Sequence, residues 1–319
     1  MRQLHGFQLS TLLAVISLGI LQTGCLPDHN PSPLSCRLTS ATQPANLVNS
    51  FFRSEEWVYN VGGRLDIYKN QVGRTLITNQ YTYDNNGYMI SNESRPLSNE
   101  VYGYVNGRLT TATRTGSISQ QIDQTTTYEY DGSGKLTRIV ISRTDPFEIE
   151  TYFFNNGLQT GYKISTVARL DFQPYTFENG LVKESTLQTP TTYTYDSQGR
   201  RTRVDFSGSA QYDYMLYEYA TGRLTSEAAP SLFKGWPDEL RTPLNSTGEG
   251  QGLLSKVHYF VKGTAGTFVK SREILFSSTQ NRNGFPLTVQ AVDRSYTSAG
   301  EQTSERTYEV ASYSYDNCQ

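Results

Sequence analysis

A short sequence motif that recurs along the chain constrains the fold more than any other feature. Two aromatic residues, two positions apart, are followed by a turn, a glycine and a new run of β-forming residues. Full copies lie at residues 81–89, 128–136 and 193–201. The glycines that follow the aromatic pairs are residues 63, 87, 107, 134, 157, 180, 199 and 222. Their mean spacing is about 23 residues, and a fixed period of this length is the signature of a repeat architecture.

Each repeat predicts a β-hairpin. Tyr, Phe, Thr, Val and Ile alternate with polar residues on both sides of the turn, which is the period of two expected of a half-buried strand. Three of the four shorter copies turn through Asn-Gly pairs, which accept the positive φ angles of a tight turn. These pairs lie at 106–107, 156–157 and 179–180. In Tyr-x-Tyr the two rings project to the same face, so neighbouring repeats are expected to stack their aromatic pairs.

The longer copies place an aspartate at the start of the turn. Asp84, Asp131 and Asp196 are expected to accept hydrogen bonds from backbone amides of their own turns. The alternative is a ladder of carboxylates that binds Ca²⁺ along one rim. Most copies keep the turn without the aspartate, which favours the local role.

These repeats resemble the tyrosine–aspartate (YD) repeats of RHS-type and teneurin proteins, which wind β-hairpins into a curved shell. The resemblance covers roughly residues 55–225. The chain is more similar still to short, tyrosine-rich lipoproteins of Bacteroidetes-type bacteria, which often end in Tyr-x-Tyr-x-x-Cys, as this chain does at residues 313–318. This second resemblance implies a porin-like β fold.

The repeats together predict the fold class. Counting both strands of every copy, including degenerate copies after residue 254, gives about 18–20 strands. We therefore expect an all-β protein, an antiparallel meander of hairpins curled into a barrel-like or shell-like sheet. Residues 226–253 lack the alternation and form an insertion. Its Phe233 and Trp236 are candidate contacts of a plug or a ligand; the alternative is an insertion that only covers exposed core.

The N-terminus predicts export and lipidation. Within residues 1–24, Arg2 supplies a positive start and an apolar run follows that is too short to cross a membrane. The run ends in Leu-Gln-Thr-Gly-Cys, which resembles a lipobox, so Cys25 is the predicted lipidation site. Residues 25–36 are then a lipidated tether, and residues 37–319 the YD-repeat-like domain. We expect a cell-envelope protein anchored by lipid in the outer membrane, with the periplasmic and surface faces both open.

The remaining cysteines predict closure of the sheet. With Cys25 lipidated, Cys36 and Cys318 are left in an oxidising compartment, where a disulfide is expected. They flank the first and the last predicted strands, and a disulfide needs Cα atoms within roughly 7 Å. A flat sheet of about 18 strands would hold its edges ~80 Å apart at ~4.8 Å per strand. The disulfide therefore requires that the sheet curl until its ends meet.

The sequence shows no catalytic constellation. Of the three histidines, His5 lies in the signal, His29 in the tether and His258 on a predicted strand. Neither a Ser–His pair nor a metal cluster can be assembled from them. A net charge of −2 argues against nucleic acid as a partner. We predict no enzymatic activity, no metal and no cofactor.

The predicted function is a binding or scaffolding role in the envelope, with the membrane as one partner and a glycan or an envelope protein as another. The tyrosine pairs are expected to fill the concave face; a glycan-binding surface protein that uses them near Trp236 is the alternative. A transmembrane barrel is less favoured, because neither face of residues 76–83 is continuously apolar. An envelope hydrolase would need an acid/base pair that the sequence does not show.

Overall fold

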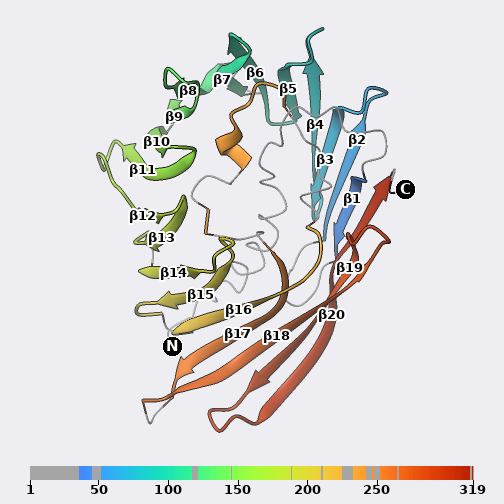
Figure 1. Ribbon diagram of the computed structural model, residues 1–319, viewed down its shortest axis with the longest axis vertical. Coiled ribbons are helices and arrows are strands. Elements are labelled where there is room, and N and C mark those ends of the chain that lie inside the picture. Colours follow the sequence, from blue (N-terminus) through green and yellow to red (C-terminus); the bar gives the residue numbers. More distant parts are fainter. Residues whose placement is uncertain are drawn as a thin grey trace.

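The protein is described by a computed structural model over residues 36–44, 52–116, 121–144, 146–187, 189–209, 211–224, 233–241, 246–247, 252–263, 266–316 and 318. These residues contain twenty β-strands and one short 3-10 helix, η1 (Asp238–Arg241). The strands form one antiparallel sheet that curls into a nearly closed barrel (Figure 1). The predicted all-β meander of about 18–20 strands is confirmed. No helix within the ranges given is long and apolar enough to cross a membrane.

The first ten strands are β1 (Arg37–Gln43), β2 (Arg53–Tyr59), β3 (Leu65–Val72), β4 (Thr75–Tyr83), β5 (Met89–Arg95), β6 (Ser98–Val105), β7 (Arg108–Gly116), β8 (Ile122–Tyr130), β9 (Leu136–Thr144) and β10 (Phe147–Asn155). The second ten are β11 (Leu158–Thr166), β12 (Tyr175–Glu178), β13 (Leu181–Ser185), β14 (Thr191–Tyr195), β15 (Arg201–Phe206), β16 (Tyr214–Ala220), β17 (Leu253–Lys262), β18 (Phe268–Gln280), β19 (Pro286–Tyr296) and β20 (Gln302–Asp316).

The sheet closes because its first and last strands pair. Consecutive strands pair from β1 to β11 and again from β12 to β20. Strand β1 then pairs with β20, and Ala41 lies opposite Tyr313. Cys36 and Cys318 form a disulfide beside this junction, with their Cα atoms 4.2 Å apart. The disulfide expected from the sequence is thus present, and the two ends of the sheet meet beside it.

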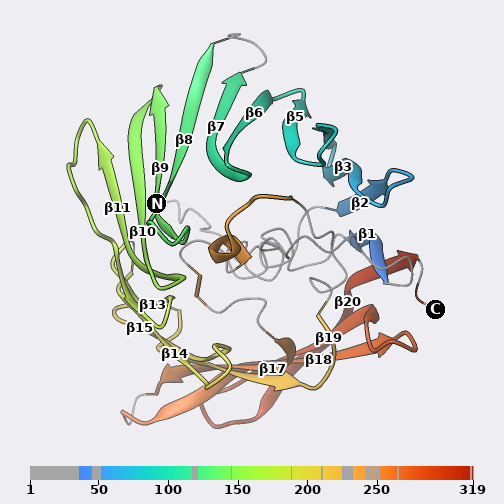
Figure 2. The same cartoon turned by 45° about the horizontal axis from the view of Figure 1, so that its top comes forward.

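One gap interrupts the ring of strands. Between β11 and β12 the only β-bridge within the described part of the chain joins Ile164 and Phe172. We call this place the seam. Figure 2 shows the ring of strands, with η1, drawn in orange, inside it.

The barrel has two rims, because successive connections in an antiparallel meander lie at alternate ends of the strands. The turn rim holds the connections after even-numbered strands, which are the repeat turns, together with the disulfide. The linker rim holds the connections after odd-numbered strands. The insertion is the connection from β16 to β17, so it starts and ends at the turn rim.

The aspartates of the repeat turns cap them locally. Asp131 accepts backbone hydrogen bonds from Ser133 and Lys135, at 2.9 and 3.0 Å. Asp84 accepts one from the amide of Tyr88, at 2.8 Å, and Asp196 makes equivalent bonds. Within the described ranges no three His, Cys, Asp or Glu side chains are grouped so that they could hold a metal ion. The aspartates are turn residues, as the favoured interpretation predicted.

A β-bulge recurs at the same place in every repeat hairpin. The register shifts just before the second aromatic position, for example between Thr82 and Tyr83 and between Gly103 and Tyr104. The other seven hairpins that end at the turn rim shift at the matching position. A bulge bends its strand and increases the local twist. Repeated at one position in successive hairpins, it bends the sheet in one sense and brings β20 back to β1.

Candidate functional site

On seven strands the second tyrosine of the aromatic pair donates a hydrogen bond to the backbone of the preceding strand. Tyr83 donates its hydroxyl hydrogen to the carbonyl oxygen of Leu65, at 2.7 Å. Leu65 lies beyond Ile67, the residue at which pairing of β3 with β4 ends, so its carbonyl has no partner on the next strand. Six further bonds of this kind, at 2.5–2.9 Å, run from Tyr59 to Leu38, Tyr104 to Met89, Tyr130 to Leu109, Tyr195 to Val182, Tyr219 to Arg201 and Tyr315 to Pro286. We call these seven bonds the tyrosine staples; each satisfies a backbone carbonyl at a strand end.

An arginine and a glycine complete the contact between hairpins. The guanidinium carbon of Arg64 lies 5.6 Å from the centroid of the Tyr83 ring. The same guanidinium fills the space that a Cβ on Gly87, whose φ is +89°, would need. The same three-residue contact joins Arg37, Tyr59 and Gly63, and joins Arg108, Tyr130 and Gly134. The repeated tyrosines therefore hold the wall together, which favours the structural interpretation over sugar stacking.

Loss of one staple should destabilise the barrel measurably. In Tyr83→Phe the ring remains, but the carbonyl of Leu65 loses its donor. We expect the free energy of unfolding to fall by about 1–2 kcal/mol, because a neutral hydrogen bond is lost and a part-buried acceptor is left unpaired. Denaturant unfolding followed by circular dichroism measures the change.

Tyr214→Phe is the matched control, because Tyr214 is half-buried and stacks on Phe260 with centroids 4.5 Å apart. Its substitution removes a hydroxyl that is not part of a staple. Equal effects of the two substitutions would contradict a special role for the staples.

Phe233 and Trp236, the two insertion residues singled out from the sequence, lie inside the barrel. The Trp236 ring packs against Phe233 and Tyr102, with centroid distances of 4.7 and 5.6 Å. Phe233 in turn packs against Tyr81, at 5.8 Å. The indole N–H of Trp236 donates to the hydroxyl of Tyr104, at 3.2 Å. Both side chains are thus held by the inner wall of β4 and β6.

The insertion is also bound to the wall through its backbone. The amide of Leu109 donates to the carbonyl of Gly235, and the amide of Val182 donates to the carbonyl of Ser246, both at 2.8 Å. These two wall residues already accept a tyrosine staple, so the insertion supplies the second partner at the same strand ends. Leu240 packs on the cluster that includes Leu136. Residues 233–241 and 246–247 of the insertion therefore lie against the inner wall between β7 and β13 (Figure 2).

Five polar side chains lie opposite one another on β6 to β10. The register pairs Glu100 with Arg114, Arg114 with Gln124, Gln124 with Arg143, and Arg143 with Glu148. We call these five residues the inner row. Their register continues through β5 to Tyr81 of β4, which contacts Phe233 of the insertion, so the row lies on the inner wall.

Glu150 is the centre of a polar cluster next to the inner row. Its carboxylate accepts hydroxyl hydrogens from Tyr152 and from Tyr162, the latter at 3.0 Å, and pairs with Arg143, which also pairs with Glu148. Burial raises the pKa of Glu150, but the two hydroxyls and the guanidinium outweigh this effect and hold the pKa below its usual value. Glu150 is therefore ionised at neutral pH, which does not suit a general acid.

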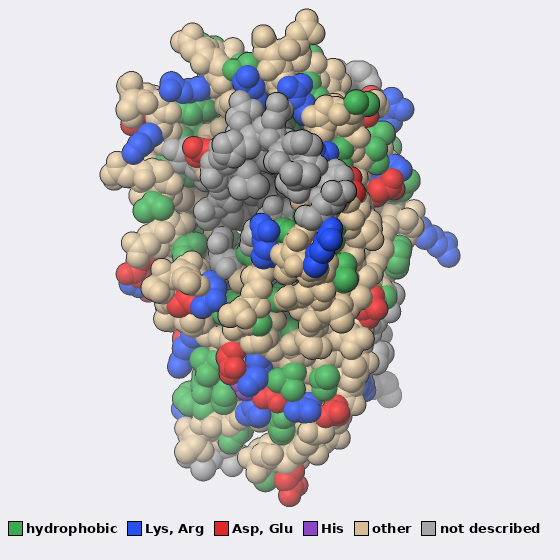
Figure 3. Space-filling view, turned by 45° about the vertical axis from the view of Figure 1, so that its right-hand side comes forward, with side chains coloured by type: hydrophobic (Ala, Val, Ile, Leu, Met, Phe, Trp, Pro, Cys, Tyr) green, Lys and Arg blue, Asp and Glu red, His purple; other side chains and the backbone are tan. Residues whose placement is uncertain are grey.

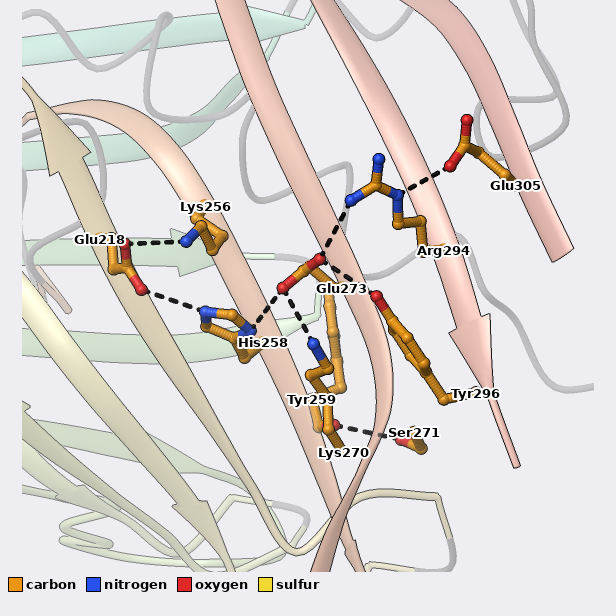
Figure 4. A network of polar contacts seen from close by, with 10 residues as sticks. All are labelled: Glu218, Lys256, His258, Tyr259, Lys270, Ser271, Glu273, Arg294, Tyr296 and Glu305. Carbon is orange, nitrogen blue, oxygen red and sulfur yellow. Dashed lines mark hydrogen bonds and ion pairs between the residues drawn. The ribbon is translucent and has the colours of Figure 1, made fainter. Parts of the chain in front are cut away.

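A second set of polar contacts lies on the outer wall, across β16 to β20 (Figure 4). His258, the one histidine in the described ranges, has Nε2 3.0 Å from Oε1 of Glu218. Its Nδ1 lies 3.1 Å from Oε2 of Glu273, although the two are not aligned for a hydrogen bond. The register then places Arg294 opposite Glu273, and Glu305 opposite Arg294.

Glu273 is the buried member of this outer set, with a side chain 9% exposed. It accepts bonds from Lys270 at 3.1 Å and from the hydroxyl of Tyr296 at 3.2 Å, and it lies 3.7 Å from Arg294. Burial raises the pKa of Glu273, but Lys270 and Tyr296 outweigh this and lower it overall. The acidic and basic side chains of this set neutralise each other's charge. The set therefore links five strands and presents no reactive group.

Sequence reasoning placed some of these residues and missed others. It assigned His258 to a strand, which β17 confirms. It did not find the inner row, because each of its members comes from a different strand. The predicted signal peptide, the tether up to residue 35 and the lipidation site Cys25 lie outside the described residues.

Comparison with known proteins finds structural similarity only. No family model and no curated protein matches the chain, so membership of the YD-repeat family stays a prediction. A porin-like protein from Bacteroides uniformis has a TM-score of 0.40 and 14% identity, over 90% of this chain and 99% of that one. A porin-like protein from Bacteroides vulgatus has a TM-score of 0.30 and 11% identity, over 88% of this chain and 99% of that one. A chain of the Photorhabdus luminescens Tc holotoxin pore has a TM-score of 0.33 and 12% identity, over 81% of this chain but 15% of that one.

Proposed function

We propose that the protein is a non-enzymatic, lipid-anchored component of the cell envelope whose barrel stands in water and acts as a rigid scaffold with a binding role. The observation that carries this proposal is the polar outer wall. A wall in contact with lipid needs a continuous apolar band, and charged side chains near the middle of a bilayer are destabilising.

Ion pairs are distributed around the outer wall. Lys69 pairs with Glu56 at 3.0 Å, with side chains 39% and 50% exposed. Further pairs join Arg138 to Glu129, Lys256 to Glu218 and Arg294 to Glu305. Figure 3 shows acidic and basic side chains interspersed over the face drawn, with hydrophobic side chains in separate groups.

Threonines pair across the outer wall between β7 and β8. Thr113 of β7 lies opposite Thr125 of β8, and Thr111 lies opposite Thr127. The buried Ala112 between them faces the inside with Tyr102. Threonine favours the β conformation and keeps a hydroxyl for water. This surface supports a barrel outside the bilayer, with a lipid on Cys25 as the attachment.

Lipidation can be tested by Cys25→Ala. We expect the wild-type chain to sediment with membranes and to stay there after a carbonate wash, and Cys25→Ala to move to the soluble fraction. Intact-mass analysis should show an acylated Cys25 in the wild-type protein. Non-reducing peptide mapping should show the Cys36–Cys318 disulfide in both chains.

Cys25→Ala is informative only if the barrel remains folded, and the unchanged disulfide is the control for that. A variant that stays in the membrane fraction with its disulfide intact would contradict the proposal, since the wall itself would then hold the protein in the bilayer.

Glycan binding at Trp236 has less support than glycan binding elsewhere on the inner wall. The indole ring already packs against Tyr102 and Phe233, and its N–H donates to the hydroxyl of Tyr104. The polar side chains of the inner row, with tyrosines beside them, are the stronger candidate.

A further inference from the structure

We propose that the inner wall from β6 to β12 binds a neutral oligosaccharide, which lies along the inner row and contacts Tyr175. This proposal rests on the binding role proposed above and gives it a ligand class. Three features of the described residues carry it: access to water, the balance of charges, and an adjoining strip of aromatic rings.

The inner row is open to solvent in part. The side chains of Arg114 and Arg143 are 35% and 30% exposed, and that of Glu148 is 26% exposed. Glu150, next to the row, is 12% exposed. A ligand in the interior can therefore reach the row itself, whereas Glu150 mainly fixes the position of Arg143.

The charges of the row already have partners on the wall. Arg143 binds Glu148 and Glu150, and Arg114 binds Asp123 at 2.8 Å. Glu100 accepts the hydroxyl hydrogen of Tyr102, at 2.7 Å. In and beside the row, four carboxylates thus face two guanidinium groups, and this excess of negative charge disfavours an anionic ligand. Each carboxylate already accepts a bond from a donor on the wall, which weakens its attraction for a cation.

An uncharged ligand rich in hydroxyl groups matches this arrangement. A carboxylate offers about four acceptor positions, so one that already binds an arginine can accept further hydrogen bonds. The amide of Gln124 offers both a donor and an acceptor. Sugar hydroxyls supply donors and acceptors together and bring no charge that would have to lose its water.

Aromatic rings border the row on its turn-rim side. The rings of Tyr152 and Tyr162 pack at a tilt with their centroids 4.9 Å apart, and the centroids of Tyr162 and Tyr175 lie 5.5 Å apart. The first two are buried and give their hydroxyls to Glu150, whereas Tyr175 is half-buried and meets Phe177 edge to face, with centroids 6.3 Å apart. Tyr175 begins β12, next to the seam, and offers the ring on which the apolar face of a pyranose can pack.

The test uses the full chain purified from membranes in detergent, with its disulfide intact. Isothermal titration calorimetry is run with neutral hexasaccharides of glucose and of xylose, with an oligogalacturonate as the anionic probe and a deacetylated chitosan oligomer as the cationic probe. We expect binding of at least one neutral probe and none of the charged ones. Glu148→Gln and Tyr175→Leu should each raise the dissociation constant about tenfold, which is the effect of losing one good contact.

Glu56→Gln is the matched control, since it changes an exposed carboxylate on the outer wall and should leave binding unchanged. Where Tyr175→Leu fails to fold, Glu148→Gln alone decides, because its side chain is partly exposed. The proposal is overturned if no neutral probe binds, if only a charged probe binds, or if Glu148→Gln binds as the wild type does. These results are independent of the Cys25 fractionation, so failure here is distinguishable from failure of the envelope assignment.

Discussion

Replacement of both disulfide cysteines, Cys36→Ser with Cys318→Ser, is expected to lower the free energy of unfolding by about 5 kcal/mol. The two residues are 282 positions apart, so the bond closes a loop that contains almost the whole described chain. In the chain-entropy model, a bond across so long a loop removes more freedom from the unfolded chain than a short one does. Guanidinium unfolding of the variant and the wild type measures the difference.

Reduction of the wild-type protein should reproduce the effect of the double substitution, and a reductant should not change the variant further. The pairing of β1 with β20 remains in the variant, so the folded circular dichroism spectrum should be preserved. A loss of stability below about 1 kcal/mol would show that strand pairing alone closes the ring.

Alkaline pH should unfold the barrel cooperatively, and the tyrosine staples determine the pH range in which it unfolds. Burial raises the pKa of Tyr219 to about 12, and it also raises the pKa values of Tyr59, Tyr83 and Tyr315. An unfolded tyrosine ionises near pH 10. The staples therefore contribute fully below about pH 10, and their contribution is lost as the pH rises through about 12 and above.

Each tyrosine with a raised pKa lowers the stability by about 1.4 kcal/mol per pH unit in that window, because the unfolded state releases a proton that the folded state keeps. Several such tyrosines act together, so the loss should be steep. The circular dichroism signal, followed between pH 8 and 13, should be lost in one transition, and a rise in the 295 nm absorbance of tyrosinate should accompany that loss. Complete ionisation of the tyrosines near pH 10 with an unchanged fold would refute the role of the buried hydroxyls, and Tyr83→Phe should reduce the slope.

The sequence was sufficient to predict the repeat, the strand content and the meeting of the two ends of the sheet. Tyr-x-Tyr, the turn aspartates and the Asn-Gly pairs act within a single hairpin, so each is visible in a short window. Closure was predictable because Cys36 and Cys318 mark the two ends of the sheet. The structure confirmed these expectations.

The contacts between hairpins could not be predicted from the same windows. That Arg64 covers the ring of Tyr83 and occupies the space beside Gly87 depends on how far one hairpin is shifted against the next. The bulge sets this shift, and its extra residue has no strong sequence signal. The inner row was invisible for the same reason, since Arg143 and Glu148 look like ordinary polar positions in alternating strands.

The pairing of β1 with β20 also brings the two ends of the sheet together in space. Strand order around the ring is a cycle, and both termini of the sheet emerge at one rim with the Cα atoms of Cys36 and Cys318 only 4.2 Å apart. The same wall could thus be encoded by circularly permuted sequences, with the break moved to the seam between β11 and β12, where the strands are least tied to one another.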